Sequence, residues 1–251
     1  MDVVNPQPII ILDRPAHAGN VGAAARAMAN MGLEQLRLIN PRQFPHPQAV
    51  EFAAGGIGVL EKATVFPDIS SALADLNYIV ATTNRNRGQR QLLVTPRELG
   101  GHLLAAQQRP KTRIGILFGT ERTGLESIDI ERADLLCNIP TAGTMGSLNL
   151  AQAVLITTYE MMLGMNRGRT QVCENPKNHA PLASASALER FFTHLEETLI
   201  AIEFIKPKQK KHMMGSLKAI YHRAGLDTRE VAILRGILSE TVSHKKREKN
   251  R

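Results

Sequence analysis

The sequence predicts an α/β protein with a mostly parallel sheet, followed by a small α-helical extension. Short apolar runs rich in β-branched residues alternate with helix-like stretches through residues 8–165. Because these runs are apolar on both faces, they are typical of parallel strands that helices cover on both sides. Two glycine-rich turns, at residues 118–125 and 143–150, each follow an apolar run. In such sheets ligands bind at the carboxyl ends of the strands, so these turns are the expected ligand site.

The expected elements follow one another along the chain as alternating strands and helices. Strands are predicted at residues 8–12, 36–39, 63–66, 78–82, 114–118 and 135–139. Helices are predicted at residues 21–31, 48–54, 69–76, 97–107 and 148–165. Asn20 is the expected N-cap of the first helix and Gly32 its C-terminal stop, since amide side chains cap helices and glycine ends them.

A polar, proline-containing linker is expected at residues 166–184, between a domain of residues 1–165 and a helical part of residues 185–251. Apolar residues recur at helical spacing just after the linker, which predicts a first helix there. They are Leu188, Phe191, Phe192, Leu195, Leu199 and Ile202. Further helices are predicted at residues 213–224 and 229–238, before a charged tail at residues 244–251.

The 251-residue chain carries a formal net charge of +8, which favours a polyanionic partner such as RNA or DNA. Residues 206–251 hold thirteen Lys and Arg against four Asp and Glu, a net of +9, so the excess lies in the helical part. Such a segment is either a solvated face or an arm that contacts phosphates. Aromatic residues make up 4% of the chain and Trp is absent, so stacking on bases is expected to be limited.

The two cysteines, Cys137 and Cys173, belong to no Cys/His cluster, so neither a disulfide framework nor a metal site is expected. No apolar run reaches the roughly 18 residues that a membrane span needs. The first residues also lack the pattern of a signal peptide. A cytoplasmic protein without a membrane anchor is the resulting expectation.

The two glycine-rich turns combine backbone N–H groups with the side chains of Glu121, Ser147 and Asn149. This set suits an adenine edge, a ribose and an amino-acid tail, and it leaves several nucleotide ligands open. The segment 19–26 after the first strand lacks the third glycine and the acidic residue of a dinucleotide-binding fingerprint. Arg26 lies there among small apolar residues, where an arginine is expected to emerge at an edge or to meet an anion.

Three segments resemble, in order, the three motifs of the SpoU/TrmH branch of the SPOUT methyltransferases. They are residues 20–26, 118–125 and 147–151, and the resemblance spans about residues 8–165. The helical part is similar to that of the TrmJ family within this branch, through residues 188–196 and 233–238. Thr120 stands where an arginine is expected in TrmJ-like relatives, a departure that bears on substrate detail.

The resemblance implies a SPOUT fold, whose sheet ends in a C-terminal trefoil knot, and a homodimer with each active site at the subunit interface. It implies S-adenosyl-L-methionine as cofactor, no metal, and 2'-O-methylation of tRNA at nucleotide 32 of the anticodon loop. The implied cofactor pocket is lined by Thr82, Thr83, Asn84, Gly119, Ile139, Gly146, Ser147 and Leu148. The implied catalytic arginine is Arg26, surrounded by Asn20, Glu121, Ser147 and Asn149.

Methyl transfer from a sulfonium to a ribose 2'-OH is an in-line displacement that needs alignment and loss of the hydroxyl proton. Because a guanidinium stays protonated, Arg26 is expected to bind the adjacent phosphate and to stabilise developing oxyanion charge. An RNA phosphate or water is then expected to take the proton. Two alternatives stay open: the same reaction on ribosomal RNA or another tRNA nucleotide, and a non-catalytic RNA-binding SPOUT protein.

Overall fold

The protein is built on a seven-stranded sheet in the order β3-β2-β1-β6-β4-β7-β5, in which every pairing is parallel. The computed structural model describes residues 7–84, 91–142, 146–169, 180–206 and 210–249. The strands are β1 (Ile9–Asp13), β2 (Leu36–Ile39), β3 (Thr64–Phe66), β4 (Tyr78–Thr82), β5 (Leu93–Val94), β6 (Ile114–Phe118) and β7 (Leu135–Cys137). The predicted parallel α/β fold is confirmed. The structure also contains strand β5, which was not predicted because its two residues are too few to form a recognisable apolar pattern.

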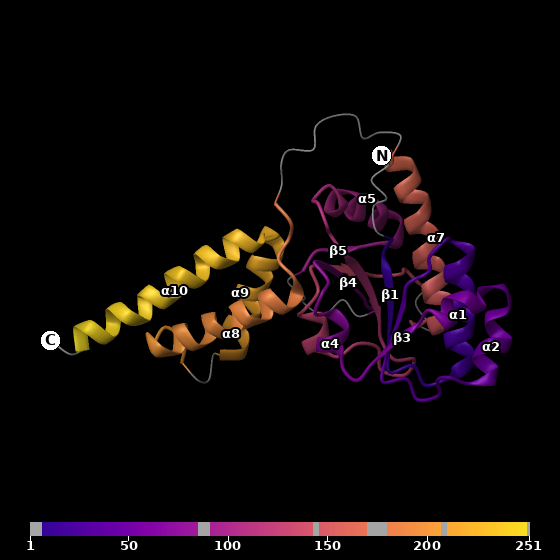
Figure 1. Ribbon diagram of the computed structural model, residues 1–251, viewed down its shortest axis with the longest axis horizontal. Helices are drawn as coiled ribbons and strands as arrows, with labels where there is room; N and C mark the ends of the chain where they lie inside the picture. The colour runs from indigo at the N-terminus through magenta and orange to yellow at the C-terminus, as the bar shows by residue number, and fades with distance from the viewer. Residues whose placement is uncertain (1–6, 85–90, 143–145, 170–179, 207–209, 250–251) are drawn as a thin grey trace.

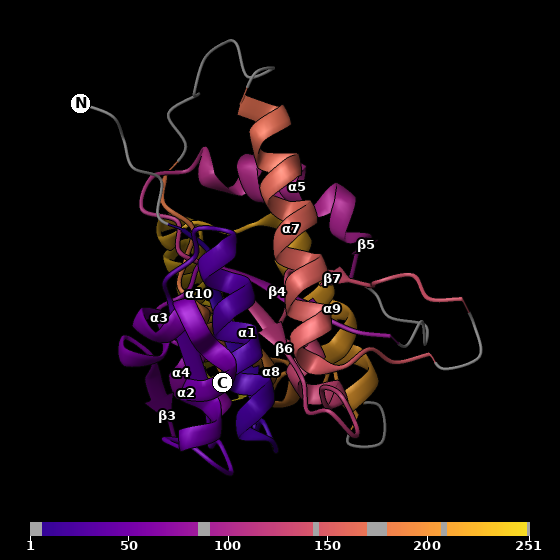
Figure 2. The ribbon, with the colours of Figure 1, turned by 90° about the vertical axis from the view of Figure 1, so that its right-hand side faces the viewer.

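Helices cover both faces of the sheet (Figures 1 and 2). One face packs against α1 (Ala18–Asn30), α5 (Pro96–Gln107) and α7 (Leu150–Arg169). Outside α1 lie α2 (Pro47–Ala53), the 3-10 turn η1 (Ala54–Gly56) and α3 (Ile57–Glu61). The other face packs against the short helices α4 (Ile69–Leu73) and α6 (Ser127–Ile130). Apolar side chains on both faces of the central strands are therefore buried, as the sequence predicted.

The start of α1 differs from the prediction. His17, rather than Asn20, is the residue that flanks the helix, which begins at Ala18. The Asn20 side chain is free to bond elsewhere because it lies inside the first turn, and it donates to the carboxylate of Glu121, 101 residues further on. A distant partner in the folded chain has replaced the local cap. The predicted stop is correct, since Gly32 has φ +71° just after the helix.

The helical extension consists of α8 (Ala185–Ala201), α9 (Lys210–Ala224) and α10 (Thr228–Lys249). Its core contains the predicted stripe residues Leu188, Phe191, Phe192 and Leu195, all of which are buried. The predicted end of the last helix at residue 238 is wrong, because α10 continues to Lys249. Lysine, arginine and glutamate are good helix formers, so a charged segment can extend a helix instead of ending it.

The extension docks at the amino ends of the central strands. The backbone N–H of Ala185 donates to the carbonyl of Leu76 at 2.7 Å, beside β4. His222 Nδ1 lies 2.7 Å from an oxygen of Asp134, just before β7. These contacts precede β4 and β7 and lie away from the carboxyl ends of both strands. In Figure 1 the extension lies on the α4 side of the sheet, opposite α1, α2 and α7. No helix in the described part of the chain is both long and apolar enough to cross a membrane.

A close crossing of two helices fixes the layer that contains α7. A Cβ atom added at Gly100 of α5 would lie 2.6 Å from the Cα of Gly164 on α7. We expect Gly100→Ala to lower the free energy of unfolding by about 1–3 kcal/mol, because the two backbones must move apart. Urea denaturation measures this change.

The matched control is Gly101→Ala, on the next residue of α5, where an added Cβ meets nothing within 4 Å. There alanine should be neutral or stabilise the helix by up to about 1 kcal/mol. Equal free energies of unfolding for the two variants would contradict the close crossing.

Candidate active site

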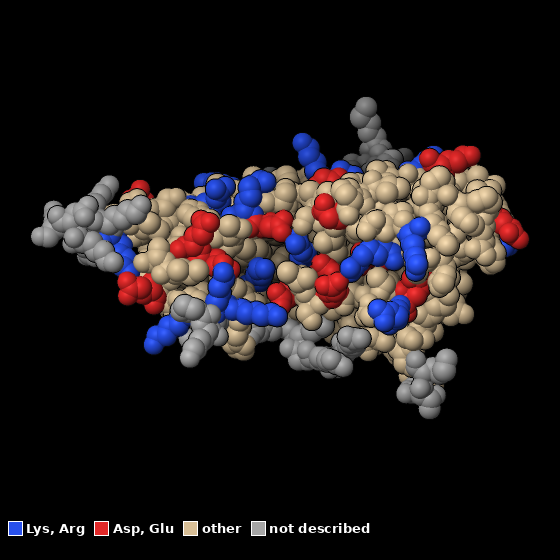
Figure 3. Space-filling model, turned by 90° about the horizontal axis from the view of Figure 1, so that it is seen from below, with Lys and Arg blue, Asp and Glu red and all other residues tan. Residues whose placement is uncertain are grey.

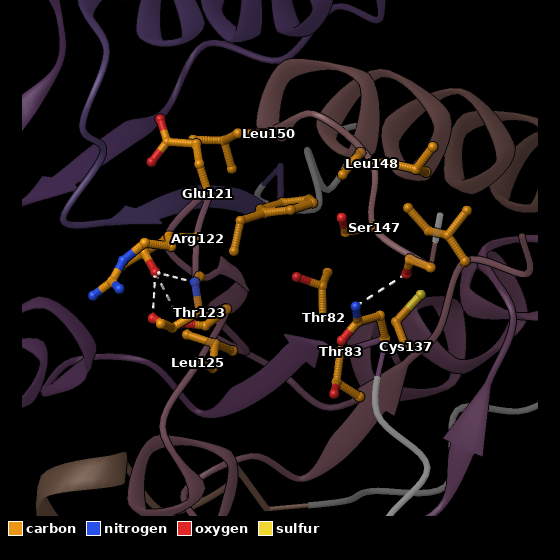
Figure 4. Close-up of a pocket in the computed structure, with 18 of the residues that line it drawn as sticks. Thr82, Thr83, Glu121, Arg122, Thr123, Leu125, Cys137, Ser147, Leu148 and Leu150 are labelled. Atoms are coloured by element: carbon orange, nitrogen blue, oxygen red, sulfur yellow. Dashed lines mark hydrogen bonds between the residues drawn. The ribbon is translucent and has the colours of Figure 1, made fainter. Parts of the chain in front are cut away.

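A pocket opens at the carboxyl ends of β4, β6 and β7, between the loops that follow these strands (Figure 4). Its lining includes all eight residues that the resemblance implied for the cofactor. They are Thr82, Thr83, Asn84, Gly119, Ile139, Gly146, Ser147 and Leu148. In Figure 4 the side chains of Thr82 and Ser147 point toward the same space, whereas Arg122 points away from it.

Hydrogen bonds tie the loops after β4 and β7 together. The backbone N–H of Thr83 donates to the Cys137 carbonyl at 2.9 Å, and Asn138 Nδ2 donates to the Thr83 carbonyl at 2.8 Å. Asn84 Nδ2 donates to the carbonyl of Gly146 at 3.0 Å, and Gly146 has φ +51°. These bonds hold two walls of the pocket together.

The turn after β6 is closed tightly on itself. A Cβ at Gly119 would lie 2.3 Å from the carbonyl carbon of Gly124, so only glycine fits. Gly124 has φ +68°, a conformation that glycine adopts without strain. The hydroxyl of Thr120 accepts a hydrogen bond from the Thr123 N–H at 3.2 Å. Thr120, the departure from the expected arginine, therefore serves to close this turn.

Beside the pocket, three of the implied catalytic residues form one hydrogen-bonded group. Asn20 Nδ2 on α1 donates to Glu121 Oε1 at 2.9 Å, and Asn149 Nδ2 donates to Asn20 Oδ1 at 2.9 Å. Asn149 also caps α7, because its Oδ1 accepts the N–H of Ala151 at 2.9 Å. We call Asn20, Glu121 and Asn149 the amide–carboxylate group. It joins the starts of two helices to the turn after β6.

The Glu121 carboxyl has a pKa below its ordinary value. Burial raises this pKa, but the hydrogen bonds from Asn20 and from the backbone N–H of Ala16 outweigh burial. The carboxylate is therefore ionised at neutral pH, and its oxygens already accept bonds within the chain. These bonds favour a positioning role for Glu121 over proton transfer.

Arg26 is not brought to this group within one chain. Six residues beyond Asn20 on α1, it lies about 9 Å further along the helix axis. Its side chain is exposed and does not line the pocket. The 3-10 turn packs against its backbone, since a Cβ at Gly56 would lie 2.8 Å from the Arg26 Cα. Of the two expectations for Arg26, the structure shows an exposed side chain, and contact with an anion stays a prediction.

The structure adds pocket residues that the sequence analysis did not single out. They are the lining residues Cys137, Thr141 and Ala153. Cys137 ends β7, and its position at the carboxyl end of a predicted strand was the available signal. Burial raises the pKa of the Cys137 thiol to about 12, so it is a neutral wall of the pocket and not a nucleophile. Cys173 lies outside the described residues.

Fold and pocket together define an α/β protein with a ligand site at the carboxyl ends of parallel strands. Residues 7–159 match the SpoU rRNA Methylase family, and residues 186–251 match the C-terminal domain of the tRNA methyltransferase TrmJ. The chain therefore belongs to the SpoU methylase family, in its TrmJ branch.

Similar proteins cover nearly the whole chain. The tRNA (cytidine/uridine/adenosine-2'-O-)-methyltransferase TrmJ of Pseudomonas aeruginosa is 36% identical over 92% of each chain. The tRNA (cytidine/uridine-2'-O-)-methyltransferase TrmJ of Pectobacterium atrosepticum is also 36% identical, over 92% of this chain and 94% of its own. The crystal structure of TrmJ from Z. mobilis ZM4 has 35% identity and a TM-score of 0.79, covering 94% of this chain and 99% of its own.

The lowered pKa of Glu121 makes a prediction about stability and pH. Because the folded protein favours the ionised form of Glu121, this carboxylate stabilises the fold at pH values above its unfolded-state pKa. The contribution is lost as the pH falls through the folded-state pKa. From pH 6 to pH 3, the melting temperature of Glu121→Gln should fall less than that of the wild type. Calorimetry measures the two pH profiles.

The control is Glu51→Gln, at an exposed carboxylate on α2. Its profile should follow that of the wild type. A Glu121→Gln profile that is parallel to the wild type would show that the carboxylate is not held ionised by the amide–carboxylate group.

Proposed function

We propose that this protein transfers the methyl group of S-adenosylmethionine to a ribose 2'-OH of tRNA in the cytoplasm, at nucleotide 32 of the anticodon loop. The main support is that all eight implied cofactor residues line one pocket, beside the amide–carboxylate group. The names of the relatives support tRNA as substrate and the 2'-oxygen as acceptor. Nucleotide 32 comes from the resemblance to the TrmJ family.

The pocket residues fit the proposed cofactor. Apolar side chains of Leu125, Ile139 and Leu148 can hold the faces of an adenine ring. The hydroxyl and amide side chains of Thr83 and Asn84 suit a ribose and an amino-acid tail. When bound there, S-adenosylmethionine supplies a methyl group on a positively charged sulfur. The protein's part is to hold this methyl group in line with the acceptor oxygen.

The reaction needs one bond exchange and one proton transfer. With S-adenosylmethionine bound, the 2'-oxygen would take the methyl group, and the sulfur would keep the electron pair of the broken carbon–sulfur bond. The 2'-OH proton passes to an RNA phosphate or to water, because the Glu121 carboxylate is occupied by Asn20 and Ala16. The Arg26 guanidinium binds the neighbouring phosphate and stabilises the developing negative charge.

We further propose that the active unit is a homodimer in which Arg26 acts at the pocket of the partner. Arg26 is exposed and lies away from its own pocket, so a second copy is needed to bring the two together. Exposed apolar side chains lie on α2 and α7, the two helices that flank α1. They are Val50, Phe52, Leu155 and Tyr159, which are 42–49% exposed. Apolar patches of this kind mark interaction sites.

The trefoil knot also belongs to this proposal. Strand β7 lies between β4 and β5, although β4 and β5 follow each other along the chain. We propose that the chain after β7 threads the connection between β4 and β5, part of which lies outside the described residues. Threading at this point would make the fold an exception to the rule that chains avoid knots.

Methyl transfer to bulk tRNA from a strain that lacks this gene tests the proposal, followed by mapping of the modified nucleotide. We expect one ribose methylation, at nucleotide 32. Arg26→Ala should lower turnover by about 10²-fold, as loss of a charge-stabilising donor does in other enzymes.

Arg42→Ala is the control, because Arg42 is exposed on the same domain outside the pocket. It should keep turnover near that of the wild type. Transfer to ribosomal RNA alone, or binding of tRNA without any transfer, would overturn the assignment in favour of one of the two alternatives.

A further inference from the structure

One aromatic side chain on the extension is held out in solvent. Phe204 follows α8 and is 61% exposed, the largest exposed fraction among the large apolar side chains that the structure describes. Ile200, near the end of the same helix, is 46% exposed. The next residue after Phe204, Ile205, is 4% exposed and belongs to the core of the extension. The turn therefore places one apolar residue inside and its neighbour outside.

The turn that carries Phe204 is fixed by its own hydrogen bonds. The N–H groups of Phe204 and Ile205 both donate to the carbonyl of Leu199, at 2.9 and 3.2 Å. Between them and the helix, Glu203 has φ +64°, which reverses the chain direction. The hydrogen bonds already fix this turn with the ring exposed. The protein therefore loses little conformational freedom when a ligand binds to the ring.

A residue from the last helix braces the same turn. Lys245 Nζ on α10 donates to the carbonyl of Ala201 at 3.0 Å and to Glu203 Oε1 at 3.1 Å. This lysine belongs to the basic segment that the sequence predicted as either a solvated face or a phosphate-contacting arm. In the structure it serves to hold the turn that exposes Phe204.

Among the other lysines of the segment, some have a partner within the described residues and some do not. Lys210 pairs with Glu196 at 2.6 Å, and the Lys218 ammonium lies 5.9 Å from the centre of the Phe192 ring. Lys206 and Lys211 are exposed near Phe204 in the chain and make no ion pair within the described residues. Figure 3 shows basic and acidic side chains interspersed on one face of the extension. Ion pairs with these acidic residues therefore limit which lysines and arginines can bind a phosphate.

We infer that Phe204 stacks on an unpaired base of the bound RNA, while Lys206 and Lys211 contact the flanking phosphates. The inference rests on the proposed RNA substrate. An exposed ring, together with exposed cations that are near it in the chain and have no ion pair within the described residues, suits single-stranded nucleic acid, since every base offers a face for stacking. It revises the expectation from composition: aromatic residues are few, but one of them is placed for stacking.

Substitutions at position 204 separate stacking from simple apolar contact. Phe204→Ala and Phe204→Leu should each weaken tRNA binding by roughly 5- to 100-fold, and Phe204→Trp should keep it. Ile233→Ala is the control, since Ile233 is an exposed apolar residue on α10, and it should bind like the wild type. Fluorescence anisotropy of labelled tRNA measures the affinities.

The Phe204→Trp variant also reports stacking directly, because the chain contains no other Trp. Its fluorescence should be quenched by tRNA and by a single-stranded oligonucleotide, and much less by a fully paired RNA duplex. Equal quenching by the duplex, unchanged affinity of Phe204→Ala, or self-association that depends on Phe204 without any change in RNA binding would overturn the inference.

Methyl transfer by the wild type, measured in parallel, separates this inference from the proposed function. If the wild type methylates tRNA and Phe204→Ala binds equally well, only the stacking role fails. If the wild type neither binds nor methylates tRNA, the proposed function fails and the stacking role fails with it.

Discussion

The carboxylate of Glu121 is the point at which three distant parts of the chain meet. It accepts hydrogen bonds from Asn20 on α1 and from the backbone before that helix, while Asn149 links Asn20 to the start of α7. A partly buried ionised group is stabilised when its oxygens accept hydrogen bonds, so these bonds hold the three segments together. The ligand pocket lies against this group, and Glu121 is one of its lining residues. The hydrogen bonds of the group therefore also hold this wall of the pocket in place.

The extension lies at the other end of the sheet. It docks through residues that precede β4 and β7, whereas the pocket opens where these strands end. This arrangement separates the proposed site of methyl transfer from the proposed RNA-contacting surface. In this proposal the pocket holds the methyl donor and the reacting ribose. The extension contacts the RNA at a distance from the reaction, through Phe204 and the lysines that have no ion pair within the described residues. An RNA substrate large enough to span both is what such a separation requires.

The sequence predicted what depends on local pattern and missed what depends on distant partners. Apolar runs located β2, β4 and β6 to the residue, and the glycine-rich turns located the pocket. From local pattern alone Asn20 was expected to cap α1, because a cap residue and a residue bonded to a distant carboxylate look alike in one sequence. Only the resemblance grouped it with Glu121, to which the structure bonds it. An exposed Arg26 was one of the two expectations. Its separation from the pocket within one chain was not predicted, because the resemblance grouped it with Asn20 and Glu121.

We propose that one chain provides the pocket and that its partner provides Arg26. Mixed dimers test it most directly, with Arg26→Ala in one subunit and Leu148→Trp in the other, where the added ring fills the pocket. Both parent homodimers should be inactive in methyl transfer. The mixed dimer should regain about half of the wild-type turnover, because one intact pocket then faces one intact Arg26. A mixed dimer as inactive as its parents would contradict the claim.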